Sequence, residues 1–148
     1  MFTRKLVTIG ALAVSCLFAP QTSRAQAELV AKGNIIEFVT HPTNSNGQVV
    51  CALFDQAGWL TKPVKPAWAK IKGSTAVCVF NEVRPGIYGI SAYHDENKNG
   101  KLDTNVVGMP TEDYGASRDA RGTFSAPSFD DAKFKYVSGR LRMTAKLK

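Results

Sequence analysis

Hydrophobic and polar residues alternate along several short segments of the chain, and no segment carries a convincing helical period. Successive side chains of a strand point to opposite faces of its sheet, so a period of two predicts strands. We expect them at residues 34–40, 48–54, 75–81 and 88–94. The segment 48–54 is apolar on both faces, which predicts a central strand. Residues 55–74 are less regular and are expected to form a loop.

The last two alternating segments, 132–137 and 140–148, flank a Ser-Gly pair. This spacing is typical of a hairpin with a two-residue turn. The predicted hairpin pairs Tyr136 with Leu141, Phe134 with Met143 and Lys135 with Arg142. About seven short strands in sequential hairpins predict an all-β fold, a single sandwich like that of immunoglobulin domains. The length of 148 residues suits one such domain, over residues 28–148.

The first 27 residues have the pattern of a secretory signal peptide. Arg4 and Lys5 precede an apolar run over residues 6–19, and an Ala-Gln-Ala site ends at Ala27. An alternative is a lipoprotein acylated at Cys16, but the residues before it make a poor acylation motif. We expect a periplasmic or secreted protein without a transmembrane segment.

Cleavage of the signal changes the charge of the chain. The whole sequence carries a net charge of +7, and loss of its three N-terminal basic residues leaves +4. That mild excess of positive charge and the predicted export argue against a nucleic-acid partner.

Cleavage also leaves two cysteines, Cys51 and Cys78, which in an exported domain predict a disulfide.

The most specific motif is an oxygen-rich loop of the form D-x-N-x-N-G-x-x-D. Its side-chain oxygens and one backbone carbonyl come from Asp95, Asn97, Asn99, Lys101 and Asp103. This spacing is that of a calcium loop, in which a glycine, here Gly100, permits the sharp turn.

The calcium pattern is incomplete. A bidentate glutamate is expected at its twelfth position, where this chain has Val106. We expect Glu112, or Asp113, to complete the ligand set, and binding to be weak. The alternative is a polar turn whose Asp and Asn side chains satisfy their own backbone.

Catalytic motifs are sparse. Only His41 and His94 remain after signal cleavage, and neither a G-x-S-x-G nor an H-E-x-x-H motif is present. His94 and Asp95 are adjacent on a strand and point to opposite sides, so they do not form a base and its orienting partner. We expect a structural role for His94 and no enzymatic activity. A small hydrolase that uses acidic residues near His94 is the least favoured alternative.

Four motifs occur in a fixed order: P-G-I-Y at 85–88, the loop at 94–103, G-M-P-T-E-D-Y-G-A-S at 108–117 and P-S-F-D-D-A at 127–132. In this order they resemble the bacterial DUF2141 family. The resemblance implies a small exported β-sandwich, with no established activity and no catalytic residues. The first two motifs also resemble prealbumin-like and B-type repeat domains, in some of which the loop holds calcium.

Together these features predict a non-enzymatic module of the cell envelope with a calcium-stabilised loop. Its partner would be an envelope protein or a glycan. The alternative is a glycan or small-ligand binding protein, with its site between residues 112–117 and the loop that carries Trp59 and Trp68.

Overall fold

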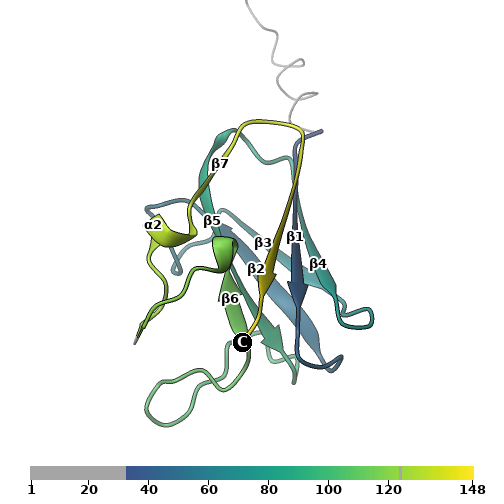
Figure 1. The fold of residues 1–148 in the computed structure, drawn as a ribbon, viewed down its shortest axis with the longest axis vertical. Helices are drawn as coiled ribbons and strands as arrows, with labels where there is room; N and C mark the ends of the chain where they lie inside the picture. The colour runs from purple at the N-terminus through teal and green to yellow at the C-terminus, as the bar shows by residue number, and fades with distance from the viewer. Residues whose placement is uncertain (1–32, 124) are drawn as a thin grey trace, which may run out of the picture.

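The protein is described by a computed structural model that covers residues 33–123 and 125–148. These residues form two β-sheets that pack face to face, so the predicted all-β sandwich is confirmed (Figure 1). The predicted signal peptide and Cys16 lie outside the described residues. Within those ranges, no helix is long and apolar enough to cross a membrane.

The first sheet has three strands in the order β4-β1-β8. They are β1 (Ile35–His41), β4 (Ala76–Asn81) and β8 (Arg140–Lys146). β4 is antiparallel to β1, whereas β8 runs parallel to it.

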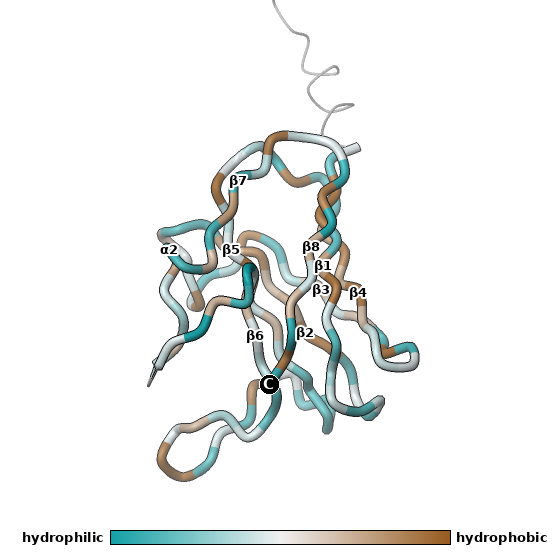
Figure 2. The backbone as a smooth tube through the Cα atoms, in the orientation of Figure 1, coloured by the Kyte–Doolittle hydropathy of each residue, from teal (hydrophilic) through white to brown (hydrophobic). Residues whose placement is uncertain are grey.

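The second sheet has five strands, four of them in the order β3-β2-β5-β6, with β7 pairing the start of β5. They are β2 (Gln48–Phe54), β3 (Lys65–Ala69), β5 (Gly86–Asp95), β6 (Tyr114–Ala116) and β7 (Phe134–Tyr136). β2 lies between β3 and β5, as its two apolar faces predict. Figure 2 shows the hydrophobic residues spread along the strands of both sheets.

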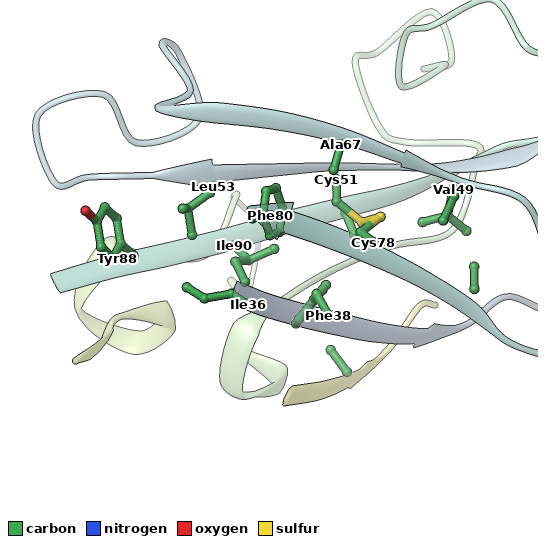
Figure 3. Packing of buried hydrophobic residues seen from close by; sticks show 14 of the residues in the cluster. Ile36, Phe38, Val49, Cys51, Leu53, Ala67, Cys78, Phe80, Tyr88 and Ile90 are labelled. Carbon is green, nitrogen blue, oxygen red and sulfur yellow. A yellow bond between two sulfur atoms is a disulfide. The ribbon is translucent and has the colours of Figure 1, made fainter. Parts of the chain in front are cut away.

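The core lies between the sheets and is built from alternate residues of their strands. Its largest fully buried hydrophobic side chains are Phe38, Phe80, Ile36, Leu53 and Ile90 (Figure 3). The predicted disulfide between Cys51 and Cys78 lies among them and joins β2 to β4. Because β2 and β4 belong to different sheets, the disulfide links the two layers covalently.

The predicted C-terminal hairpin is wrong, because β7 joins the second sheet and β8 joins the first. Both strands still turn their apolar residues to the core. The alternation therefore predicted the buried face of each strand correctly, but not the strand with which each one pairs. Electrostatics favour the observed pairing. A hairpin opposes Lys135 and Arg142, whereas the parallel pairing puts Arg142 and Arg140 beside Glu37, and both form ion pairs with it.

The segment predicted as a loop, residues 55–74, contains β3. Pro66 lacks an N–H group, and β3 tolerates it because it lies at the edge of its sheet. Two short helices, η1 (Ser117–Asp119) and α2 (Phe129–Ala132), follow β6. Together with Trp59 they build a small second cluster around Ala116, Ala120 and Ala132.

Candidate functional site

The connection from β5 to β6, residues 96–113, protrudes from one end of the sandwich (Figure 1). Its conformation begins at Asp95, the buried last residue of β5. One carboxylate oxygen of Asp95 accepts the N–H of Asn99 at 2.9 Å. The other accepts the N–H of Gly100 at 3.0 Å and the side-chain amide of Gln48 at 2.9 Å. The carboxylate therefore curls the loop back over the end of its own strand.

The other predicted side chains meet above this turn. The side-chain amides of Asn97 and Asn99 donate to the two carboxylate oxygens of Asp103, at 2.6 and 2.8 Å. Gly100 has a φ of 75°, in the left-handed region that glycine adopts without strain, as predicted. The structure thus brings together the oxygen-bearing residues at the first, third, fifth and ninth positions of the pattern.

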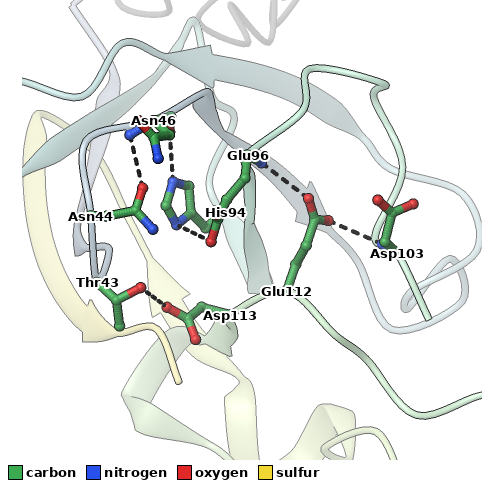
Figure 4. A network of polar contacts seen from close by, with 8 residues as sticks. All are labelled: Thr43, Asn44, Asn46, His94, Glu96, Asp103, Glu112 and Asp113. Atoms are coloured by element: carbon green, nitrogen blue, oxygen red, sulfur yellow. Dashed lines mark hydrogen bonds and ion pairs between the residues drawn. The ribbon is translucent and has the colours of Figure 1, made fainter. Parts of the chain in front are cut away.

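Glu112 braces both ends of the loop. One of its carboxylate oxygens accepts the N–H of Glu96 and the other accepts the N–H of Asp103, each at 3.0 Å (Figure 4). Asp113, the other residue expected to complete the ligand set, instead accepts the hydroxyl of Thr43 at 2.7 Å.

The loop is rich in negative charge. None of the ion pairs in the described part of the chain involves Asp95, Asp103 or Glu112. Their charge is met by N–H groups of the backbone and of amide side chains. Across residues 33–123 and 125–148, no group of three His, Cys, Asp or Glu side chains is arranged to hold a metal ion. A cation here would depend on amide and carbonyl oxygens as well as on carboxylates.

His94 lies beneath the loop and is fully buried. Its Nε2 is 2.7 Å from the carbonyl oxygen of Asn46, in the connection between β1 and β2 (Figure 4). Its Nδ1 has no hydrogen-bond partner among the described residues and lies 3.8 Å from the Glu96 carboxylate. These contacts suit the expected structural role of His94, which ties two connections at the same end of the sandwich.

A second feature lies on the outer face of the five-stranded sheet. It includes Trp68 and Tyr114, which belong to the two segments of the expected ligand site, but the sequence did not reveal that they lie in one row across the sheet. The strand registers place Trp68, Val50, Tyr93 and Tyr114 in one row across four strands. Residues paired across strands share a face of the sheet, so these side chains form one row, called here the aromatic row, in which Val50 separates Trp68 from the two tyrosines. The Arg121 guanidinium lies over the Tyr114 ring, 5.8 Å from its centroid. Trp68 is 60 % exposed. Burial, and then the nearby Asp95 and Glu112 carboxylates, raise the pKa of Tyr93 above 10.0.

The two tryptophans of the expected ligand site do not lie together. Trp59 packs edge-on against Phe54 and Phe129, with ring centroids 5.5 and 5.6 Å apart, and its ring N–H donates to the Pro127 carbonyl. Trp59 is therefore part of the small second cluster, whereas Trp68 remains free on the sheet.

Searches of the curated proteins and of the solved structures each return no match. The resemblance to prealbumin-like and B-type repeat domains stays a prediction. A family match covers residues 38–144, which includes all of the loop and most of both sheets. It confirms the resemblance seen in the sequence, and the chain belongs to the family described as an uncharacterized protein conserved in bacteria (DUF2141).

Proposed function

We propose that this protein is a non-enzymatic, exported module of the bacterial envelope whose loop after β5 is stiffened by calcium. The observation that carries the proposal is the convergence of Asp95, Asn97, Asn99 and Asp103 in one loop, where the carboxylates of Asp95 and Asp103 form no ion pair with any of the described residues. Hard cations such as Ca²⁺ take six to eight oxygen ligands, and alternate residues of a curled loop supply them.

The Oδ1 atoms of Asn97 and Asn99 accept the N–H groups of Asn99 and Lys101, at 3.0 and 2.8 Å, and these bonds fix the orientation of both carboxamides. A cation at this site would have to replace the bonds that their NH₂ groups donate to Asp103, and it would take the Asp103 carboxylate as a ligand. The carbonyl of Lys101 and the remaining lone pairs of Glu112 are the further ligands. Because few of the ligands are charged, we expect a dissociation constant of about 10⁻⁴–10⁻³ M.

Export is supported by the disulfide. Disulfides form and persist in oxidising compartments and are rare in the cytosol. The buried Cys51–Cys78 bond therefore favours a periplasmic or secreted location, in line with the signal peptide predicted for residues 1–27.

Calcium removal tests the proposal. With a dissociation constant near 10⁻³–10⁻⁴ M, about 10 mM calcium would stabilise the fold by roughly 1.4–2.7 kcal/mol. We expect the melting temperature to rise by several degrees in calcium relative to a chelator. Asp103→Asn should remove most of this rise, because it deletes a charged ligand.

Asp130→Asn is the matched control for Asp103→Asn. It removes an exposed acid of α2, whose ion pair is with Lys133, the residue that follows this helix. The calcium-dependent rise should persist in this variant. Identical melting curves in calcium and in chelator for the wild-type protein would refute the calcium site.

The aromatic row favours a second candidate function, the binding of a glycan or a small ligand. Sugars stack on flat aromatic faces, and the row from Trp68 to Tyr114 crosses four strands, a span of roughly 14 Å at about 4.8 Å between neighbours. The Tyr93 hydroxyl is protonated at neutral pH, as tyrosine hydroxyls ordinarily are, so it can donate a hydrogen bond to a ligand.

Titration with envelope oligosaccharides tests the row, with tryptophan fluorescence as the readout. A binding oligosaccharide should change the emission of exposed Trp68. Trp68→Ala removes this reporter, so its affinity is measured by isothermal titration calorimetry beside the wild type, and it should fall by about tenfold or more. Val64→Ala, which changes an exposed apolar residue outside the row, should leave affinity unchanged. No response across a broad panel of neutral and acidic glycans would exclude this function.

A further inference from the structure

The chain contains two Asn-Gly pairs, Asn46-Gly47 and Asn99-Gly100, and the structure gives them different surroundings. An asparagine followed by glycine is open to deamidation, in which the backbone nitrogen of the following residue attacks the side-chain carbonyl carbon. Glycine favours this reaction because it has no side chain to hinder its nitrogen. Both asparagines are exposed, so exposure alone does not distinguish the two pairs.

The first pair is held in place. The Asn46 carbonyl oxygen is 2.7 Å from Nε2 of His94, and the Asn46 N–H donates to the side-chain oxygen of Asn44 at 2.8 Å. Gly47 is pressed against the carbonyl oxygen of Asp95, which would lie 2.0 Å from an added Cβ atom. Ring closure between the Asn46 side chain and the Gly47 nitrogen requires the peptide between them to turn, and these contacts oppose that movement.

The second pair is surrounded by groups that the reaction needs. The Gly100 N–H, which must lose its proton when the nitrogen attacks, donates to the Asp95 carboxylate at 3.0 Å. A carboxylate that accepts an N–H draws its proton away from the nitrogen, which makes the nitrogen a better nucleophile. Nothing lies within 4 Å of an added Cβ atom at Gly100, so the space beside this residue is open.

The Asn99 carboxamide is oriented by two hydrogen bonds. Its Oδ1 accepts the N–H of Lys101 at 2.8 Å, and its Nδ2 donates to Asp103 at 2.8 Å. Attack on Cγ places negative charge on Oδ1, and a backbone N–H that already points at this oxygen stabilises that charge. The attacking nitrogen belongs to the next residue, so ring closure needs only rotations about the bonds of Asn99.

We propose that the loop after β5 promotes the deamidation of its own Asn99. The Gly100 nitrogen forms a bond to Cγ of Asn99, the bond from Cγ to Nδ2 breaks, and the proton of the Gly100 N–H leaves with the NH₂ group as ammonia. Water then opens the resulting succinimide ring at either of its carbonyls, which leaves aspartate or isoaspartate at position 99. The reaction consumes water and needs no other reactant.

The conversion changes the loop irreversibly. The side-chain N–H that bonded to Asp103 is lost, and two carboxylates then face each other in its place. Like charges so close together repel, so the loop loosens as the protein ages. The inference does not require the calcium site proposed above, because the reaction uses only hydrogen bonds already present in the loop.

Mass spectrometry of the ageing protein tests the proposal. The protein is purified as the cell processes it and kept at neutral pH in a chelator, so that the outcome is independent of calcium. One sample stays folded, and the other is unfolded in guanidinium chloride. Both are incubated in isotopically labelled water and then digested, and the mass of each peptide shows how much of its Asn-Gly pair has exchanged nitrogen for oxygen.

In the unfolded chain the two pairs should convert at similar rates. In the folded protein, Asn99 should convert about tenfold or more faster than in the unfolded chain, whereas Asn46 should convert more slowly. Asp95→Asn should remove the acceleration at Asn99, because an amide is a far weaker proton acceptor than a carboxylate. Asp130→Asn, which changes an exposed acid of α2, is the matched control and should keep the acceleration.

A rate for Asn99 in the folded protein that is equal to or below the rate in the unfolded chain would overturn the proposal. This comparison uses the wild-type protein alone, so it holds even where Asp95→Asn does not fold. Equal conversion of Asn46 and Asn99 in the folded protein would also overturn it. So would a product that is aspartate alone, since direct hydrolysis by water bypasses the ring and yields no isoaspartate.

Discussion

At the scale of residues, the loop was predictable because its contacts are local. Asp95, Asn97, Asn99 and Asp103 lie within nine positions, so spacing alone indicated that they would meet. The contact of Gln48 with Asp95 was missed, since it depends on the register between two strands far apart in sequence.

Gly47 shows the same dependence on a distant contact. Its φ is +68°, and a Cβ atom there would lie 2.0 Å from the carbonyl oxygen of Asp95. The turn before β2 is therefore pressed against the start of the loop, and only a residue without a side chain fits between them. This contact and the bond from His94 to Asn46 hold the two connections together.

We predict that Gly47→Ala destabilises the fold more than a left-handed backbone alone explains. Gly73→Ala is the control, because Gly73 has a similar φ of +63° and nothing within 4 Å of its added Cβ. Placing alanine in the left-handed region costs roughly 1–2 kcal/mol, which is the loss expected for Gly73→Ala. Urea denaturation should show a larger loss for Gly47→Ala, and equal losses would contradict the proposed contact.

At the scale of elements, alternation identified most strands but not all of their partners. It located β1, β2, β4 and β5 to within two residues at each end. β3 was missed because its inward residues are the small Ala67 and Ala69, and because Pro66 within it and Pro63 just before it favour a loop. The partner of β8 was wrong because a short turn favours the neighbouring strand, whereas burial and the charge of Glu37 select β1.

Cysteine pairs can verify the observed partner of β8. Glu37 and Arg142 are direct neighbours in the parallel register, so Glu37→Cys/Arg142→Cys should form a disulfide on mild oxidation. Lys135→Cys/Arg142→Cys should not, because these residues belong to strands of different sheets. Cys51 and Cys78 are already paired with each other and do not compete. Peptide mapping identifies the bond, and the opposite outcome would restore the hairpin.

At the scale of the whole molecule, the sandwich class followed from alternation, whereas the aromatic row and the exposed apolar tip of the loop after β5, Val106 and Val107, did not. The row needs four strands in register, and the tip is recognisable only once the side chains of Val106 and Val107 are seen to have no cover. Neither feature can be recognised from a short stretch of the sequence, because both depend on the tertiary structure. The covalent link between the layers, by contrast, was predictable from the number of cysteines.

The disulfide should contribute much of the net stability of the sandwich. It closes a loop with a sequence separation of 27, for which chain entropy gives about 3–4 kcal/mol. We expect Cys51→Ala/Cys78→Ala to lower the free energy of unfolding by at least that amount, since both sulfurs are also buried in the core. Urea denaturation gives the free energy of unfolding of the oxidised protein, the reduced protein and the variant, and the differences measure the contribution of the disulfide. Equal stability of all three would show that packing alone holds the sheets together.

The parallel pairing of β1 and β8 also decides how the domain can be displayed on a support. The backbone at Ile35 and Gly139 is hydrogen-bonded at one pole, whereas Lys148 pairs with Tyr114 at the base of the loop, at the other pole. A linker joined ahead of residue 33 would hold the domain by the pole remote from the loop and leave the tip facing outward (Figure 1). A linker joined after Lys148 would lie near the base of the loop and would restrict access to its tip. Reporter fusions and immobilised assays of this protein should therefore be attached through the N-terminal side.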